Sequence, residues 1–519
     1  MEKTCICLMN DSFPPMIDGV ATAVSQYARF ITQNHGQTVV ATPEYPGVTD
    51  AYPFPVVRYP SVNTTKLVGY RTGVPFHAQS VRELSGYPID LIHSHCPLVS
   101  TYLARTVRQT KNVPLVLTYH TKFDIDIAKA VRSGQLQSAA IRLLIDNVSA
   151  CDEVWVVSKG AGDNLHGLGY QGDCYLMENG VDFPRGKASP AAVYALRERL
   201  HADYNIDTED GAPLFLFVGR MMWYKGIRLI LDALRTLSDA NLPYHMVFIG
   251  DGMDFAEIKA YTEELRLTDR CVFTGAIRDR ELLRAYYSIG TLFLFPSTFD
   301  TNGIVVREAA ACGLPSMLIS GSCAAEGITD GRTGFLVEEN APSIAALLKK
   351  VCGDKSRCAA VGECAMREIY LSWEDAVARA WERYQIVIER NRSGAVRKPE
   401  PLSDEIFIGI ADVLDKVNKM HAVRSDIEAF TEEILQKGTA LREESAEKLE
   451  QQYRAIAAKA EAYRAESAQF LSEHRDRAAD RTKKLYEEAA EWFEQENAEF
   501  RERYHEIHDR LWDLLDRYL

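Results

Sequence analysis

Short apolar segments that alternate with longer amphipathic ones constrain the fold of this chain more than any other feature of its sequence. Segments such as Cys5–Met9, Leu115–Tyr119, Leu214–Val218 and Leu292–Phe295 are rich in strand-forming residues. Helical patterns of roughly 10 to 15 residues separate most of them. This alternation predicts an α/β fold made of βαβ units, with doubly wound parallel sheets.

The alternation breaks once, in the polar stretch HADYNIDTEDGAP, after which a new strand begins. We therefore predict two Rossmann-like domains, residues 1–187 and 188–370, that face a cleft. Ligands of such sheets bind outside the carboxyl ends of the strands. The aromatic-rich segment 371–391 is expected to form a crossover helix, and 392–402 a polar linker.

Residues 403–519 have a different character. No proline occurs after Pro401, and from Leu485 onward core-compatible residues recur mostly every three or four positions, with one interruption at Glu496. The pattern predicts a long α-helical, coiled-coil-like extension. Its interspersed charges favour contact with protein, so we expect a homo-oligomer formed through residues 403–519. A helical hairpin folded against the chain's own globular part is the alternative.

Charge and cysteine content exclude several classes of protein. The net charge of −14 argues against a general nucleic-acid-binding protein, which needs a basic surface. The N-terminal segment has too short an apolar run for a signal peptide. The 11 cysteines are scattered, as is usual for reduced thiols inside a cell. We therefore expect a cytoplasmic protein.

Two cations follow one of the predicted strands. The segment GRMMWYKG comes directly after Leu214–Val218 and places Arg220 and Lys225 beyond the carboxyl end of that strand. A planar guanidinium and a compact ammonium suit the oxygens of a diphosphate. Two unrelated surface cations at a turn are the alternative for this segment taken alone.

A second strand end carries two carboxylates. Phe295 ends a strand, and the turn at Asn302-Gly303 precedes a helix that continues through Glu308. The N–H groups at such a helix start attract an anion. Asp300 in the loop and Glu308 in the helix can both accept hydrogen bonds from sugar hydroxyls. In the alternative interpretation Asp300 caps the helix and Glu308 is solvated.

Together these segments resemble a known family. FPPMIDGVATAV, GRMMWYKG, FIGDG, VFTGAI and EAAACGLPS are similar to motifs of the retaining, nucleotide-sugar-dependent glycosyltransferases of family 4, which have the GT-B fold. The resemblance covers roughly residues 4–390 and implies a hexosyltransferase with a nucleotide-sugar donor.

For single residues, the resemblance implies roles in binding the donor. Arg220 and Lys225 would hold the diphosphate, and Glu308 would bond the ribose hydroxyls. Asp300 stands where the family usually has Glu and would touch the transferred sugar. Because the family is mostly metal-independent, no metal and no cofactor are expected. The remaining donor-binding residues implied are Gly19 (which follows Asp18 in place of a first glycine), Ile277, Gly303 and Ile304.

Histidines mark two further strand ends. His120 ends the strand in LVLTYHTKFD, and the resemblance places it near the reacting sugar. His93 and His95 have strand spacing and point to one side; a metal site is possible in principle, but a structural or site-lining role is favoured. Asp124-Ile-Asp126 could be mistaken for a metal-binding Asp-x-Asp motif. We predict as catalytic residues His120, Asp300, Arg220 and Lys225.

The acceptor is suggested by local charge. Between Pro60 and Arg142 the chain has ten Lys or Arg and four Asp or Glu, despite its negative total. A basic face suits an anionic membrane, at about 1 kcal/mol per cation. The segments TYHTKFD and STFDTNGIVVREAAA also resemble enzymes that glycosylate diacylglycerol. We therefore expect transfer of a hexose, with glucose as the first candidate, from a UDP-sugar to a membrane lipid by a peripherally membrane-associated enzyme.

Two other functions remain open from the sequence. One keeps the same chemistry with a soluble sugar, cyclitol or polysaccharide as acceptor. The other is a non-catalytic scaffold that acts through the coiled-coil extension.

Overall fold

The computed structural model describes residues 3–16, 18–65, 70–124, 127 and 134–394. All of these belong to the first of the two units into which the chain divides, Met1–Asp412. The predicted extension 403–519 lies outside the described residues. Its helical character and the homo-oligomer expected from it therefore stay predictions.

The first sheet has seven parallel strands in the order β3-β2-β1-β6-β7-β8-β9. The chain begins at β1 in the middle of the sheet, adds β2 and β3 toward one edge, and then crosses to β6 and continues to the other edge, as in dinucleotide-binding folds. A small antiparallel pair, β4 and β5, lies apart from it. The strands of this half are β1 Cys5–Met9, β2 Gln37–Pro43, β3 Val56–Tyr59, β4 Ser61–Val62, β5 Thr72–Gly73, β6 Leu91–Ser94, β7 Leu115–Tyr119, β8 Glu153–Val156 and β9 Cys174–Leu176.

The second sheet repeats the arrangement with six parallel strands in the order β12-β11-β10-β13-β14-β15. Both predicted Rossmann-like domains are therefore present. The strands are β10 Leu214–Val218, β11 His245–Ile249, β12 Cys271–Gly275, β13 Leu292–Phe295, β14 Ser316–Ile319 and β15 Phe335–Val337.

Helices connect the strands of both sheets, as parallel pairing requires. Those of the first half are α1 Gly19–Asn34, α3 Ala78–Ser85, α4 Val99–Lys111, α6 Gly134–Ser149 and α7 Lys159–Gly167. Those that follow are α8 Pro190–Tyr204, η1 Trp223–Lys225, α9 Ile227–Asp239, α10 Phe255–Glu264, α11 Arg280–Ile289, α12 Ile304–Ala311, η2 Cys323–Ala325, α13 Ala341–Gly353, α14 Ser356–Glu368 and α15 Trp373–Arg392.

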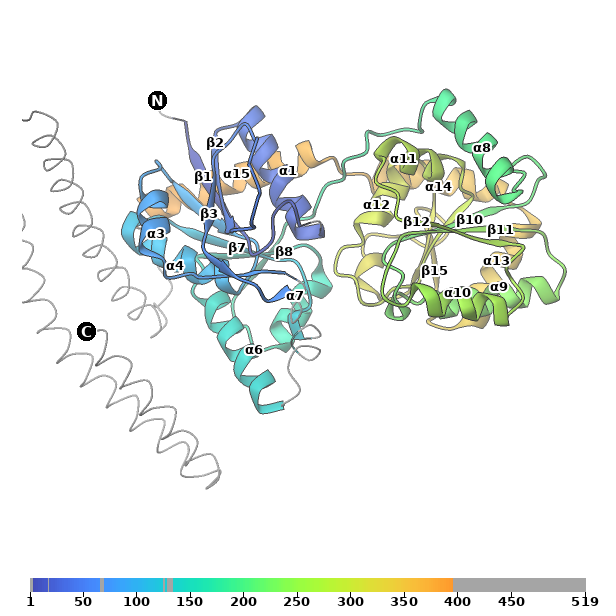
Figure 1. Cartoon of the computed structure of the whole chain (residues 1–519), viewed down its shortest axis with the longest axis horizontal. Coiled ribbons are helices and arrows are strands. Elements are labelled where there is room, and N and C mark those ends of the chain that lie inside the picture. The colour runs from blue at the N-terminus through green and yellow to red at the C-terminus, as the bar shows by residue number, and fades with distance from the viewer. Residues whose placement is uncertain (1–2, 17, 66–69, 125–126, 128–133, 395–519) are drawn as a thin grey trace, which may run out of the picture. The chain divides into compact units, whose positions relative to one another are not determined.

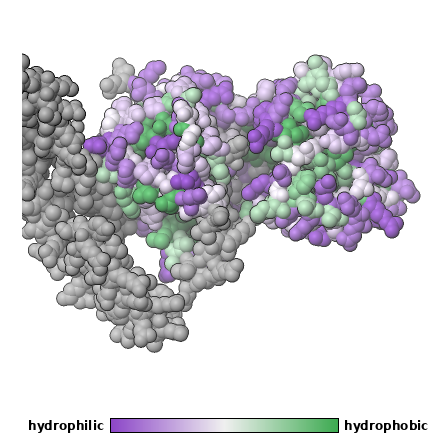
Figure 2. Space-filling model, in the orientation of Figure 1, coloured by the Kyte–Doolittle hydropathy of each residue, from purple (hydrophilic) through white to green (hydrophobic). Residues whose placement is uncertain are grey.

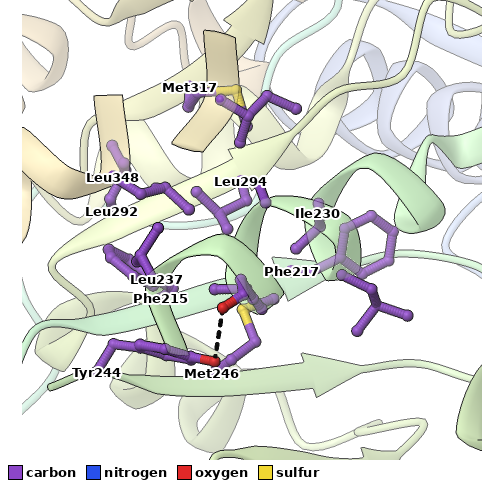
Figure 3. Packing of buried hydrophobic residues seen from close by; sticks show 14 of the residues in the cluster. Phe215, Phe217, Ile230, Leu237, Tyr244, Met246, Leu292, Leu294, Met317 and Leu348 are labelled. Atoms are coloured by element: carbon purple, nitrogen blue, oxygen red, sulfur yellow. Dashed lines mark hydrogen bonds between the residues drawn. The ribbon is translucent and has the colours of Figure 1, made fainter. Parts of the chain in front are cut away.

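One hydrophobic core of the second half shows why these segments adopt their structures. Every residue of β10 and β13 is buried, as expected for strands covered on both faces. Helix α9 buries Ile230, Leu234 and Leu237, which recur at helical spacing along one side. These side chains pack with those of β10, β11, β13 and β14 (Figure 3).

Helix α15 returns the chain to the first half. Ser372 caps it by accepting a hydrogen bond from the backbone N–H of Asp375, and Trp373 and Tyr384 are buried in the core of the first half. In Figure 1 this helix, drawn in orange, lies beside α1. The crossover helix predicted at 371–391 is thus present as α15, and it packs on the N-terminal domain.

The surface is mixed in polarity. On the face drawn in Figure 2, hydrophilic side chains cover most of the outer edge of the second half, and hydrophobic ones are interspersed. Among the described residues, no helix combines the length and the apolar character that crossing a bilayer requires.

Candidate active site

Several of the predicted site residues lie where the strand order of a sheet reverses. In the second sheet this point lies between β10 and β13, which pair directly with Phe215 opposite Leu292. Arg220 and Lys225 follow β10, and Asp300 follows β13. The carboxyl ends of strands at such a reversal are the usual ligand site of these folds.

Lys225 and Asp300 form an ion pair. Nζ of Lys225 lies 2.5 Å from Oδ1 of Asp300, and the side chain of Lys225 is only 8% exposed. Gly226 makes this approach possible, because it has a left-handed φ of 76° and a Cβ there would lie 2.8 Å from the carbonyl oxygen of Pro296. The two loops are therefore closely packed where the donor is predicted to bind.

Arg220 differs from Lys225 in its environment. It is exposed, and its guanidinium lies 5.9 Å from the centre of the Tyr224 ring. A hydrogen bond holds the loop that carries Arg220 in place, because the backbone N–H of Trp223 donates to Oδ2 of Asp254 at 2.8 Å. Of the two cations predicted to bind a diphosphate, one is thus buried and paired and the other faces solvent.

The loop after β13 also contacts the first domain. The hydroxyl of Thr301 donates to the carbonyl oxygen of His120 at 2.5 Å, and Nδ2 of Asn302 donates to the carbonyl oxygen of Val157 at 2.8 Å. A Cβ on Gly19 would meet Cδ1 of Ile304 at 3.9 Å. The structure thereby brings together residues predicted from opposite halves of the sequence.

Helix α12 begins without a side-chain cap. Its N-cap residue, Gly303, has a left-handed φ of 60°, and no side chain bonds the first N–H groups. The alternative that Asp300 caps this helix is therefore wrong. Uncapped N–H groups at a helix start attract an anion, and here they follow the loop in which Asp300 pairs with Lys225.

Several polar atoms of the same loop are buried without a hydrogen-bond partner among the described residues. They are Oγ of Ser297, Oδ2 of Asp300 and Oδ1 of Asn302. Buried polar atoms in folded proteins nearly always have a hydrogen-bond partner, so a cluster without partners indicates a place where a ligand or water binds. Hydroxyl groups of a bound sugar would supply the missing partners.

Glu308 is held by residues that sequence reasoning missed. Its Oε1 lies 2.7 Å from Nη2 of Arg280, and its Oε2 accepts from the hydroxyl of Tyr287 at 3.1 Å. Burial raises the pKa of Glu308, while the charge of Arg280 and the two hydrogen bonds lower it. Arg280 also stacks on Phe183, 4.2 Å from the ring centre. Glu308 is therefore buried and oriented, not solvated.

His120 belongs to a buried group of histidines. Its Nε2 lies 2.9 Å from Nδ1 of His95, and the His95 ring lies 3.9 Å from that of His93. Burial lowers the pKa of His120 to about 3, and lowers the pKa values of His93 and His95 well below their usual value. All three rings are therefore neutral at physiological pH.

Metal-ligand groups were sought among the same residues. In the described part of the chain, no group of three or more His, Cys, Asp or Glu side chains is placed to hold a metal ion. Oδ1 of Asp124 accepts a hydrogen bond from Nδ2 of Asn164 at 3.2 Å. Asp126, the second acid of the possible Asp-x-Asp motif, lies outside the described residues.

Ile277 lies apart from the other predicted residues. It follows β12, an edge strand that β11 separates from β10, and it packs against the core of the second domain. The structure thus places it at the side of the sheet and not at the strand reversal.

Comparison with known proteins agrees with this architecture. Residues 17–185 match the model for "Glycosyltransferase Family 4", and residues 197–367 match that for "Glycosyl transferases group 1". The two matches together cover about two thirds of the chain.

Relatives and solved structures of this kind are numerous. The alpha-monoglucosyldiacylglycerol synthase of Streptococcus pneumoniae is 22% identical over 314 residues, which are 60% of this chain and 70% of that protein. The GDP-mannose-dependent alpha-mannosyltransferase of Corynebacterium glutamicum is 25% identical over 390 residues, or 73% and 86%. The crystal structure of Anabaena HepE in complex with UDP and glucose has a TM-score of 0.58 at 18% identity, covering 74% of this chain and 100% of that one.

Two Rossmann-like domains with cations and a free helix start at the strand reversal define a glycosyltransferase of the GT-B fold. With the family matches over both domains, the chain belongs to the family 4 glycosyltransferases.

Proposed function

We propose that this protein transfers a hexose, with glucose as the expected sugar, from a UDP-sugar to a membrane lipid such as diacylglycerol, with retention of configuration and without a metal. The ion pair of Lys225 with Asp300 beside the uncapped start of α12 carries the proposal. It joins a group suited to a diphosphate with a group suited to sugar hydroxyls.

Donor binding follows from the charges of the site. Arg220 is exposed and free to approach phosphate oxygens, and Lys225 contacts Asp300 in the loop that leads to the start of α12. The unpaired Oδ2 of Asp300 and Oγ of Ser297 would accept and share hydrogen bonds with the hydroxyls of the sugar. Glu308, oriented by Arg280, would accept hydrogen bonds from the ribose.

The proposed reaction needs no covalent enzyme intermediate. The acceptor hydroxyl attacks the anomeric carbon from the face that the nucleotide leaves, and the bond between that carbon and the phosphate oxygen breaks. The electron pair stays on the diphosphate, and the acceptor proton passes to a diphosphate oxygen. Lys225, Arg220 and the start of α12 stabilise the charge that develops there.

The relatives differ in the nucleotide of their donors, so they support uridine in the donor of this protein only in part. Anabaena HepE, which shares the fold, was crystallised with UDP and glucose, and this favours uridine. The Corynebacterium relative uses GDP-mannose. Both nucleotides therefore belong in the test of this proposal.

Support for a lipid acceptor comes mainly from the Streptococcus relative, which is named for a diacylglycerol product. The local excess of basic residues contributes less than their number suggests. Arg105 is buried and pairs with Asp146, and Arg108 pairs with Asp152, so neither is available to a membrane. Phe76 is exposed in the same domain and offers an apolar contact instead.

Nucleotide release from UDP- and GDP-sugars, with and without diacylglycerol vesicles, tests the proposal. We expect release from a UDP-sugar only with vesicles, and a rate that falls as salt screens the attraction to an anionic surface. Donor binding with release only when a sugar, cyclitol or polysaccharide is added would establish the soluble-acceptor alternative. Failure to bind any donor would instead favour the scaffold.

A further inference from the structure

A chain of buried side chains leads from the crossover helix to His120. The hydroxyl of Tyr384 on α15 lies 2.6 Å from Nδ1 of His93, and Nε2 of His93 lies 2.7 Å from Oγ1 of Thr118. His95 lies next to His93 and contacts His120 through Nδ1. His95 and His120 follow β6 and β7, which are neighbours in the sheet.

The contact between His95 and His120 joins two ring nitrogens, and a hydrogen bond there needs one proton. Because both rings are neutral, each ring has one protonated nitrogen and one bare nitrogen. If Nδ1 of His95 carries the shared proton, Nε2 of His120 accepts it and the N–H of His120 is at Nδ1. If Nε2 of His120 carries the shared proton instead, Nδ1 of His95 accepts it. Nδ1 of His120 is then a bare acceptor, and the N–H of His95 is at Nε2.

Nε2 of His95 distinguishes these two arrangements. This atom is buried and has no hydrogen-bond partner among the described residues. A bare nitrogen with an unused lone pair is the better occupant of such a position, because orphaned buried N–H donors are rarer than under-satisfied acceptors. The first arrangement is therefore the favourable one.

We propose that His95 is a positioning residue that donates from Nδ1 to Nε2 of His120 and so fixes His120 as the tautomer with its proton on Nδ1. His95 is itself held in place. Its backbone N–H donates to the carbonyl oxygen of Met9 at 2.8 Å, and its ring packs edge-on against Tyr27 at 5.2 Å. The burial that lowers the pKa values of both histidines keeps either ring from taking up a second proton.

The consequence for the reaction rests on the proposed function. Among the described residues Nδ1 of His120 has no hydrogen-bond partner, and the carbonyl oxygen of His120 is bonded to Thr301 beside Asp300. With the proton on Nδ1, His120 would donate a hydrogen bond to an oxygen of the bound sugar or acceptor. It would position that oxygen and would not act as a base.

Nitrogen NMR of the full-length protein labelled with ¹⁵N-histidine tests the tautomer without any need for turnover. The His120 signals are assigned by their loss in His120→Gln. We expect a protonated Nδ1 and a bare Nε2 in the wild type, and a mixture of tautomers in His95→Phe, which keeps a ring but cannot donate. A proton on Nε2 of His120 in the wild type would overturn the proposal, even if His95→Phe failed to fold.

Activity measurements add a test that a merely structural role would not pass. His95→Asn places an amide N–H near the former Nδ1, so it should keep turnover within about fivefold of the wild type. His95→Phe should lower kcat by about 10- to 100-fold with little change in the donor KM, because the hydrogen bond that orients His120 is lost. Equal losses in both variants would contradict the proposal. If no sugar is transferred at all, the NMR result still decides the tautomer.

Discussion

Nζ of Lys225 lies 2.5 Å from Oδ1 of Asp300, so the cation predicted to bind the donor diphosphate and the carboxylate predicted to touch the sugar are already in contact. The contact joins the loops after β10 and β13, which meet because these strands are neighbours in the sheet. The cation and the carboxylate are thus held in fixed positions by neighbouring strands, and preorganised charge is what stabilises a transition state most effectively.

Replacing Lys225 tests its role in stabilising the leaving diphosphate. Lys225→Ala should lower kcat by roughly 10²–10³, the scale for loss of one preorganised charge. The matched control is Lys259→Ala, which removes an exposed lysine of α10 and should leave kcat unchanged. Near-normal turnover of Lys225→Ala would remove Lys225 from the mechanism.

Replacing Asp300 tests its contact with the sugar. Asp300→Asn keeps the size of the side chain but removes its charge, and we expect kcat/KM for the donor to fall about 10- to 100-fold, as for a hydrogen bond to a charged group. Asp239→Asn, at a carboxylate that is 58% exposed, is the control. If both variants behave alike in steady-state kinetics, Asp300 does not touch the donor.

Arg280 is expected to act through Glu308. In Arg280→Ala the buried carboxylate loses its partner at 2.7 Å, so it should take up a proton more readily and hold the ribose less well. We predict a donor KM about 10- to 100-fold higher with a smaller change in kcat. Arg199→Ala, at an exposed arginine of α8, serves as the control. An unchanged KM would show that Glu308 needs no orientation by Arg280.

Glu326 of the second domain contacts the start of α7 in the first domain, and hydrogen exchange can test this contact. The carboxylate of Glu326 accepts from the backbone N–H groups of Lys159 and Gly160, each at 2.6 Å. Helix-start N–H groups have no partner within their own helix, so Glu326→Ala should expose them. Hydrogen exchange at these two amides should become about 10- to 100-fold faster. Glu363→Ala on α14 should have no such effect, and equal protection in both variants would contradict the contact.

The buried histidines should make stability depend on pH. His120 stays neutral down to a pKa of about 3 in the folded protein, whereas an unfolded histidine takes up a proton near pH 6.5. Between these values the unfolded state binds more protons, so the free energy of unfolding falls as pH drops, by about 1.4 kcal/mol per pH unit for each such histidine. The melting temperature of the wild type should therefore fall from pH 7 to pH 5.

His120→Gln removes one of these groups and should show a smaller fall in melting temperature. His201→Gln, at an exposed histidine of α8, should behave like the wild type. A fall in His120→Gln as large as that of the wild type would mean that His120 is protonated in the folded protein.

The sequence was sufficient to predict much of the fold. Strands such as β1, β7, β10 and β13 have the predicted bounds, because a short apolar run between turns has few other ways to be buried. β14 and β15 were missed. β14 lies in a charge-free stretch with Gly313 and Pro315, where period and composition do not separate strand from loop. Helix α8 was also missed, in a stretch whose polar residues indicated a break between domains.

The candidate site was predicted in part for a similar reason. A residue that directly follows a parallel strand lies at the carboxyl end of the sheet. Arg220, Lys225 and Asp300 could therefore be assigned to that end from the sequence. Which side chains then touch depends on the order of strands, and no local pattern encodes that order. Arg280, the partner of Glu308, left no such signal, and His95 was noted at a strand end without its contact with His120.

Transfer of radiolabelled glucose from UDP-glucose into extractable lipid measures the central claim most directly. The full-length protein would be incubated with diacylglycerol vesicles, beside its Lys225→Ala variant. We predict labelled glycolipid with the anomeric configuration of the donor, formed roughly 10²–10³ times more slowly by the variant. Binding of UDP-glucose without any label in the lipid fraction would contradict the account.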